Sequence, residues 1–281
     1  GELNVTANSA IHIFNEDNPN ATGDMIILGT LRGNSDLAVS ASTAVTGADL
    51  SDGLRFRGAG ISDYSGTITV NNRVKFEMQM QDSFAPNPIG TAKIIAVAGT
   101  STGELRGTYP MIHPRLVGGG HTYMLGNDIE VSGPGYVNFN VLGGTGAVAQ
   151  FGNLRVGEGQ IVGASKNDLS NRSLEFTSVT LTGGNAEFRA FDPGFAVATN
   201  ADRGGANILL GAINEVSPGS GIVFNSSGSY VNEVTGVATY TGRTDIETGT
   251  LRIGFAGSIA SSSEVEISSG AKLDLFQHFL G

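Results

Sequence analysis

The sequence contains no cysteine and no tryptophan. The absence of cysteine excludes disulfide bonds, thiolate zinc sites and cysteine nucleophiles, and it is compatible with any redox compartment. Only 15% of the residues are charged, and the formal net charge is -10. A highly charged disordered chain is therefore excluded. Because a phosphate backbone needs a basic protein face, we also expect no nucleic-acid partner.

Long apolar runs and prolines are also scarce. The longest apolar run, Ile94 to Ala98, is far shorter than the roughly 20 residues of a membrane-spanning helix, so we expect no membrane insertion of this segment. Proline occurs 8 times, whereas 42 of the 281 residues are glycine. The glycines have no three-residue period, which excludes collagen and predicts many turns. The chain begins at Gly1 without a leader, which indicates a mature product or an excised piece.

The stretch from Tyr240 to Leu275 has the clearest internal pattern. Short strands are predicted at 250–253, 263–267 and 272–275, between glycine and serine turns. Within each strand two apolar side chains share one face and a charged side chain takes the other. Such short strands are not stable as isolated hairpins. They are stable if successive coils stack and their inward aliphatic residues form one column, so the pattern predicts a β-solenoid.

The order of glycines and aliphatic pairs in this stretch resembles a known repeat. Tyr240-x-Gly242 precedes Gly249-Thr250-Leu251, Gly257-Ser258-Ile259, Val265-x-Ile267 and Gly270-Ala271-x-Leu273-Asp274-Leu275. This order resembles the autotransporter-associated β-strand repeat of bacterial passenger domains and giant surface proteins. The resemblance covers residues 240–275 and implies a right-handed parallel β-helix that is extracellular, on the bacterial cell surface. It carries over no catalytic residues.

Residues 1–81 and 127–281 share this strand and turn pattern. In the first segment, short strands are predicted at 3–5, 11–14, 25–28, 37–39, 54–56, 67–70 and 74–80. In the second, strands before the Tyr240 motif are predicted at 129–131, 136–142, 154–156, 174–176, 179–181, 186–191, 208–210, 222–224 and 237–240. Tyr64-Ser65-Gly66 begins a weaker copy of the Tyr240 motif, although Asn71-Asn72-Arg73 replaces the expected Gly-Thr-Leu turn. We predict two diverged copies within one continuous solenoid.

Residues 82–126 interrupt the pattern. Prolines at 86, 88, 110 and 114 cannot donate to a strand ladder, three consecutive glycines follow at 118–120, and a strand is predicted only at 93–98. We therefore predict a loop-rich excursion in the middle of the solenoid. Insertions in solenoids are often binding loops, so this segment is our candidate surface for a glycan or a cell surface. The candidate residues are Tyr109, His113, Arg115, His121 and Tyr123.

Paired carboxylates are the argument for an enzyme. Asp128-x-Glu130 and Glu264-x-Glu266 each place two carboxylates on one strand face. General acid and base cleavage of a polysaccharide needs such a pair, and some parallel β-helices carry such enzymes. The alternative is a solvated strand face, whose charges also discourage edge pairing. We favour this alternative and expect no enzymatic activity.

Calcium is the only cofactor that the sequence suggests. Asn15, Asp17 and Asp24 lie in one turn-rich segment and offer hard oxygen ligands. The segment matches no known calcium loop, and Asn and Asp are common turn residues, so a plain turn is the favoured interpretation. His113 and His121 could meet across a loop, but no third metal ligand is evident.

The segment 275–281 is apolar and has no evident polar cap. The first and last coils of a solenoid present unpaired backbone edges. Phe276, Phe279 and Leu280 are therefore predicted to mark an assembly end, where the chain continues or meets another subunit. The leading prediction is a non-enzymatic extracellular structural protein that associates end to end, as a rod, stalk or repeating subunit of a surface filament or sheath. The alternatives are an autotransporter-type adhesin and, with less support, a polysaccharide-cleaving β-helix enzyme.

Overall fold

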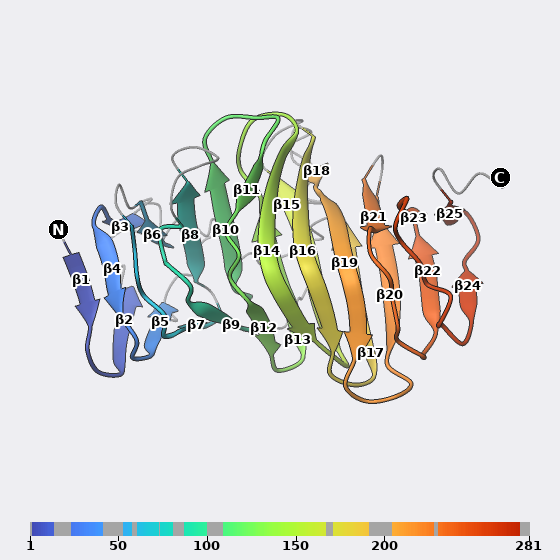
Figure 1. Cartoon of the computed structure of the whole chain (residues 1–281), viewed down its shortest axis with the longest axis horizontal. Coiled ribbons are helices and arrows are strands. Elements are labelled where there is room, and N and C mark those ends of the chain that lie inside the picture. The colour runs from blue at the N-terminus through green and yellow to red at the C-terminus, as the bar shows by residue number, and fades with distance from the viewer. Residues whose placement is uncertain are drawn as a thin grey trace.

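Two long parallel sheets run side by side along the whole molecule (Figure 1). The computed structural model describes residues 2–13, 24–41, 53–57, 61–72, 74–80, 87–99, 109–166, 171–190, 204–227 and 230–275. Within these ranges the elements are strands, with no helix, so none is long and apolar enough to cross a membrane. The predicted all-β fold, a parallel β-helix or β-solenoid, is confirmed.

In the described ranges, sheet 1 has 12 strands and sheet 2 has 11. In spatial order sheet 1 contains β2 (Ser9–Ile13), β5 (Leu37–Ala41), β7 (Thr67–Val70), β9 (Lys93–Val97), β12 (Ile129–Ser132), β14 (Ala147–Val156), β16 (Arg172–Leu181), β19 (Asn207–Glu215), β21 (Val231–Val234), β23 (Thr250–Ile253) and β25 (Lys272–Asp274), with β11 (Thr122–Met124) beside β14. Sheet 2 contains β3 (Asp24–Ile27), β6 (Gly53–Phe56), β8 (Lys75–Met80), β10 (Met111–Leu116), β13 (Gly135–Asn140), β15 (Gln160–Lys166), β17 (Asn185–Ala190), β20 (Gly221–Ser226), β22 (Thr244–Thr248) and β24 (Val265–Ile267), with β18 (Gly204–Gly205) antiparallel to β15. A small third sheet pairs β1 (Glu2–Val5) with β4 (Thr30–Gly33).

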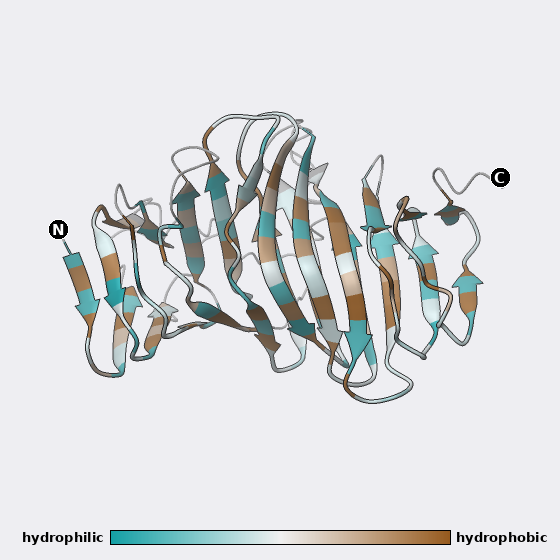
Figure 2. Cartoon of the chain, in the orientation of Figure 1, coloured by the Kyte–Doolittle hydropathy of each residue, from teal (hydrophilic) through white to brown (hydrophobic). Residues whose placement is uncertain are grey.

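Apart from β1, β4, β11 and β18, the chain alternates between the two long sheets, so each coil places one strand in each. Residues at alternate positions point inward, and the inward positions are aliphatic or aromatic, which gives the banded hydropathy of Figure 2. One inward row of sheet 1 stays aliphatic over seven strands. Its members pair in register and are at most 2% exposed: Leu37, Ile68, Ile94, Ile129, Leu154, Val179 and Ile213. This row is the apolar column that the sequence predicts.

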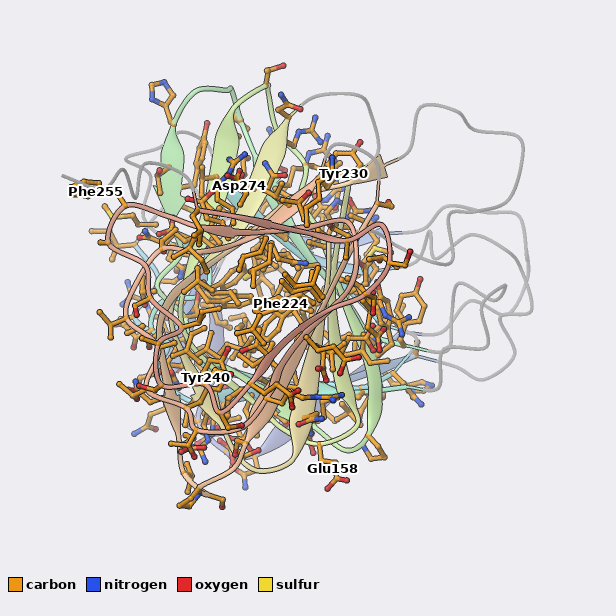
Figure 3. The ribbon with its side chains drawn as sticks, turned by 90° about the vertical axis from the view of Figure 1, so that its right-hand side faces the viewer. Glu158, Phe224, Tyr230, Tyr240, Phe255 and Asp274 are labelled. Carbon is orange, nitrogen blue, oxygen red and sulfur yellow. The ribbon has the colours of Figure 1, made fainter. Side chains whose placement is uncertain are left out.

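Aromatic rings join the two sheets across the core. The ring of Phe139, on β13 of sheet 2, lies 5.6 Å from that of Phe151 and 5.4 Å from that of Phe176, on β14 and β16 of sheet 1. All three side chains are fully buried, and both contacts are edge-to-face, the geometry that aromatic quadrupoles favour. In the end-on view of Figure 3, Phe224 lies in the same interior, whereas Phe255 and Glu158 lie at the periphery.

The two Tyr-x-Gly motifs form similar corners of the solenoid. The hydroxyl of buried Tyr64 donates to the carbonyl oxygen of Ser35 at 2.6 Å. The hydroxyl of buried Tyr240 lies 2.5 Å from Thr244 Oγ1. A Cβ on Gly66 or on Gly242 would lie 2.3 Å from a backbone oxygen of the preceding coil, which no side chain tolerates. Close approach of adjacent coils therefore explains both glycines.

Residues 82–126 contribute more to the solenoid than the predicted excursion allows. Strand β9, which was predicted, pairs with β7 and β12, and β10 pairs with β8 along its whole length. We expected a loop at β10 because of its proline. Pro114 is accommodated because β10 pairs with β13 only through Met111 and Ile112, and because its carbonyl oxygen still accepts a hydrogen bond from the Leu142 amide at 3.0 Å.

Candidate binding surface

The five residues of the predicted binding surface do not form one surface. Tyr109 is 3% exposed, and its ring packs edge-on against the ring of Tyr136 with centroids 4.8 Å apart. Tyr123 is also buried, and its hydroxyl donates to the carbonyl oxygen of Val117. Both tyrosines therefore act as packing residues. His121 is exposed, in the turn before β11.

The structure brings together the other two predicted residues, His113 and Arg115. They lie two positions apart on β10, so both side chains point outward from sheet 2. His113 is buried, whereas the Arg115 side chain is 43% exposed. Strand β10 thus carries one buried and one accessible nitrogen-bearing side chain on the same face.

A buried carboxylate, that of Glu77, lies at the centre of this face. Arg55 on β6, Glu77 on β8 and His113 on β10 stand in register on three adjacent strands. Arg55 Nε lies 2.5 Å from Glu77 Oε1, and Arg55 Nη2 donates to Glu77 Oε2 at 3.1 Å. Lys75 Nζ lies 3.7 Å from Oε2, and Arg115 Nη1 lies 3.6 Å from Oε1. We call these side chains, together with His113, the Glu77 cluster.

The environment of the cluster keeps the His113 ring neutral. Burial lowers the pKa of His113 well below its ordinary value of 6.5, and the positive charges of Lys75, Arg115, Arg55 and Arg172 lower it further. His113 Nδ1 lies 3.8 Å from Glu77 Oε2, beyond hydrogen-bond distance, and neither ring nitrogen has a hydrogen-bond partner among the described residues. A neutral imidazole offers one donor and one acceptor, and both are unsatisfied here.

Sequence reasoning missed Arg55, Lys75, Glu77 and Arg172. The alternation Lys75-Phe76-Glu77-Met78 correctly indicates that Glu77 points away from the core. An outward charge on a strand is normally solvated, yet Glu77 is 1% exposed because both faces of β8 are buried. No local pattern in the sequence distinguishes these two cases.

The two carboxylate pairs lie on different sheets, and three of the four side chains bond to neighbouring groups. Asp128 Oδ1 accepts a hydrogen bond from the Asn153 amide at 2.8 Å. Glu130 on β12 bonds to Lys93 Nζ at 2.5 Å, and Glu266 on β24 bonds to Arg243 Nη1 at 2.7 Å. Glu264 is exposed, just before β24. The ion pairs match the solvated-face interpretation of these carboxylates.

The calcium candidates fall largely outside the described residues. Asn15 and Asp17 are not among them, and Asp24 begins β3, where only its backbone is described. Over the ranges that the structure describes, no group of three or more histidine, aspartate or glutamate side chains could hold a metal ion. The predicted assembly residues Phe276, Phe279 and Leu280 also lie outside the described residues.

The last described coil nevertheless exposes an apolar edge. Ile267 on β24 pairs with Ile246, which is 1% exposed, yet Ile267 itself is 47% exposed. Val265 pairs with the buried Thr244 and is 39% exposed. These residues occupy core rows that no described coil covers. We call Val265 and Ile267, with Leu273 on β25, the C-terminal apolar edge.

The opposite end of the solenoid is hollowed. A pocket of about 370 Å³ lies at the first coil, between β1, β2 and β3. Its lining is almost wholly apolar and includes Leu3, Ile11, Met25, Ile27 and Leu28. We call it the N-terminal pocket. Both ends of the described solenoid therefore present apolar side chains.

No protein-family model, curated protein or solved structure matches this chain.

Proposed function

We propose that this protein is a non-enzymatic, extracellular structural protein, a β-solenoid rod that joins end to end as part of a cell-surface filament, stalk or sheath. The observation that carries this proposal is the C-terminal apolar edge, where Ile267 continues a core row but remains 47% exposed. The resemblance of residues 240–275 to the autotransporter-associated β-strand repeat supports the extracellular, bacterial location.

Strand direction supports contact between copies. The strands on the main path of each long sheet all pair in parallel, from β2 to β25 in sheet 1 and from β3 to β24 in sheet 2. A second copy placed further along the axis would therefore continue both sheets with the same strand direction. The C-terminal apolar edge would then cover the N-terminal pocket of the next copy. Such a head-to-tail contact uses two different surfaces and propagates along the rod.

Analytical ultracentrifugation over a range of concentrations, with electron microscopy of the same samples, tests this assembly. We expect rods that lengthen with concentration. Val265→Lys is expected to shorten them, because it places a charge in the contact. Val216→Lys is the matched control, because Val216 is 61% exposed in the turn after β19. Rods of constant length in the parent protein, or equal assembly of Val265→Lys and the parent, would contradict the proposal.

The location at the cell surface needs a separate measurement. Protease treatment of intact source cells is expected to cleave the protein without lysing the cells. Protection until lysis would contradict the extracellular assignment.

An adhesin that binds a glycan is the second candidate. The observation that favours it is the accessible guanidinium of Arg115, next to the buried His113 on the outer face of sheet 2. This function is compatible with a rod, since a solenoid displays its outer faces along its length.

A further inference from the structure

The Glu77 cluster has more cationic than anionic side chains. Among the described residues, Glu77 supplies the carboxylate that faces Arg55, Lys75 and Arg115. Arg172, on β16, adds a fourth positive charge that acts on His113. Buried charge is costly unless it is matched by opposite charge. Arg55, Lys75 and Arg172 have further partners, so the inference rests on Arg115 and His113.

The Arg115 guanidinium has N–H donors that Glu77 does not engage. Its closest approach to Glu77, 3.6 Å from Nη1 to Oε1, is too long for a hydrogen bond. A guanidinium has five N–H donors in a fixed plane, and this one is 43% exposed. It can therefore hold two oxygens of a carboxylate or sulfate from the solvent side.

His113 supplies the second, independent observation. Its side chain is 5% exposed, and within the part of the chain that the structure describes both ring nitrogens lack a hydrogen-bond partner. An unsatisfied buried polar group costs about 1 to 3 kcal/mol, so native proteins rarely keep one without a use. The ring lies on the same face of β10 as Arg115, and both approach the same carboxylate. An anion held by Arg115 would therefore lie on the face of β10 from which the His113 ring also projects.

We infer that the Arg115 and His113 face of sheet 2 binds the anionic group, carboxylate or sulfate, of an acidic polysaccharide. The inference names the ligand class of the adhesin alternative and rests on it. It is independent of end-to-end assembly, which is tested at the C-terminal apolar edge.

The surroundings favour a sparsely charged polymer. Further along the outer face of sheet 2, Arg189 is paired with Glu187, and Arg243 is paired with Asp245 and Glu266. Among the described side chains of sheet 2, these two arginines thus lie closer to carboxylates than Arg115 on β10 does. A nucleic acid needs many phosphate contacts and would meet a protein of net charge -10. A polysaccharide whose acidic groups alternate with neutral hydroxyls needs only a local cationic contact.

Isothermal titration with partly methyl-esterified polygalacturonate, dextran sulfate of low sulfate content and neutral dextran tests the inference. We expect one or both acidic polymers to bind and neutral dextran not to bind, and the active polymer identifies carboxylate or sulfate as the ligand group. Arg115→Gln is expected to weaken this binding about tenfold, the effect of losing one charge-assisted hydrogen bond.

Arg155→Gln is the matched control. Arg155 is 42% exposed on the outer face of sheet 1, with Nε 3.9 Å from Glu130 Oε2, so its charge and exposure match those of Arg115. Absence of binding by both acidic polymers would overturn the inference. Equal weakening in the two variants would also overturn it, because it would indicate general attraction between the polymer and any surface cation.

A measurement on the unmodified protein tests the same site without relying on a variant that must fold. We expect the acidic polymer to shift the imidazole NMR resonances of His113, whereas those of His12, on β2, stay unchanged. Binding without any shift at His113 would overturn the proposed site. Rod length, measured with and without polymer, separates a failure of this inference from a failure of the assembly proposal.

Discussion

Replacing Glu77 by glutamine removes one negative charge and nearly preserves the size of the side chain. In the structure this carboxylate is 1% exposed and lies within 4 Å of nitrogens of Arg55, Lys75, His113 and Arg115. Removing one member of a buried ion pair leaves the other charge uncompensated in a low-dielectric environment. We therefore expect Glu77→Gln to lower the free energy of unfolding by about 3 to 5 kcal/mol.

Glu130→Gln provides the comparison for this substitution. Glu130 is also an outward carboxylate on a strand, and its contact with Lys93 Nζ is 2.5 Å, but its side chain is 35% exposed. Water and salt screen such a pair, so we expect a loss of about 0.2 to 1 kcal/mol. The contrast isolates burial, because the chemical change is the same in the two variants.

Equilibrium urea unfolding followed by circular dichroism measures both losses. The effect of Glu130→Gln is expected to shrink at high salt, whereas that of Glu77→Gln persists. Similar losses in the two variants would refute the reasoning. That result would mean that the carboxylate of Glu77 does not offset the buried cations around it.

The remaining predictions concern pH, the core and a corner. Because the pKa of His113 is lowered, the unfolded chain binds its proton first, and the free energy of unfolding falls below about pH 6.5, by up to about 1.4 kcal/mol per pH unit. In urea unfolding at several pH values, His113→Gln is expected to flatten this slope, and an unchanged slope in this variant would contradict the assignment. Phe176→Ala removes a buried ring of the cross-sheet cluster and is expected to lower the free energy of unfolding by about 3 to 5 kcal/mol. Phe255→Ala, at a 79% exposed position, is expected to lower it by at most about 0.5 kcal/mol. Equal thermal unfolding midpoints of the two variants would contradict the role of Phe176 in the core. Gly242→Ala places a Cβ 2.3 Å from the Ser220 carbonyl oxygen and is expected to cost about 1 to 3 kcal/mol in urea unfolding; unaltered stability would show that this corner can relax.

Much of the fold could be predicted because each coil carries its own local pattern. The predicted strands 67–70 and 250–253 coincide with β7 and β23. In both strands, buried side chains that point inward alternate with partly buried side chains that point outward. The Tyr-x-Gly motifs also identified two corners, where the lack of space for a Cβ explains the glycines.

The longest strands were underestimated. Strand β14 spans Ala147–Val156, although only 154–156 was predicted, because Gly152 interrupts the pattern in mid-strand. A Cβ at Gly152 would lie 2.4 Å from Asp128 Oδ1, so a contact with the preceding coil, rather than a turn, accounts for this glycine. Glycine is ambiguous in a solenoid, since it serves both turns and close approach between coils.

The candidate site was predictable only in part. The sequence identifies His113 and Arg115 as candidate binding residues but predicts a loop around them, whereas both lie on strand β10. Their partners come from β6 and β8, so the cluster depends on register between coils that are distant in the sequence. A single sequence carries no direct signal of that register.

The parallel rows between coils also determine how the molecule would respond to force. Along the row from Leu37 to Ile213, each side chain stacks on those of the coils before and after it. Tension applied between the two ends would therefore load the interfaces between neighbouring coils, and the outermost coil would detach first. Each detachment would release the length of one coil while the remaining stack stays intact. A solenoid of this kind would lengthen in discrete steps under load rather than fail in a single event.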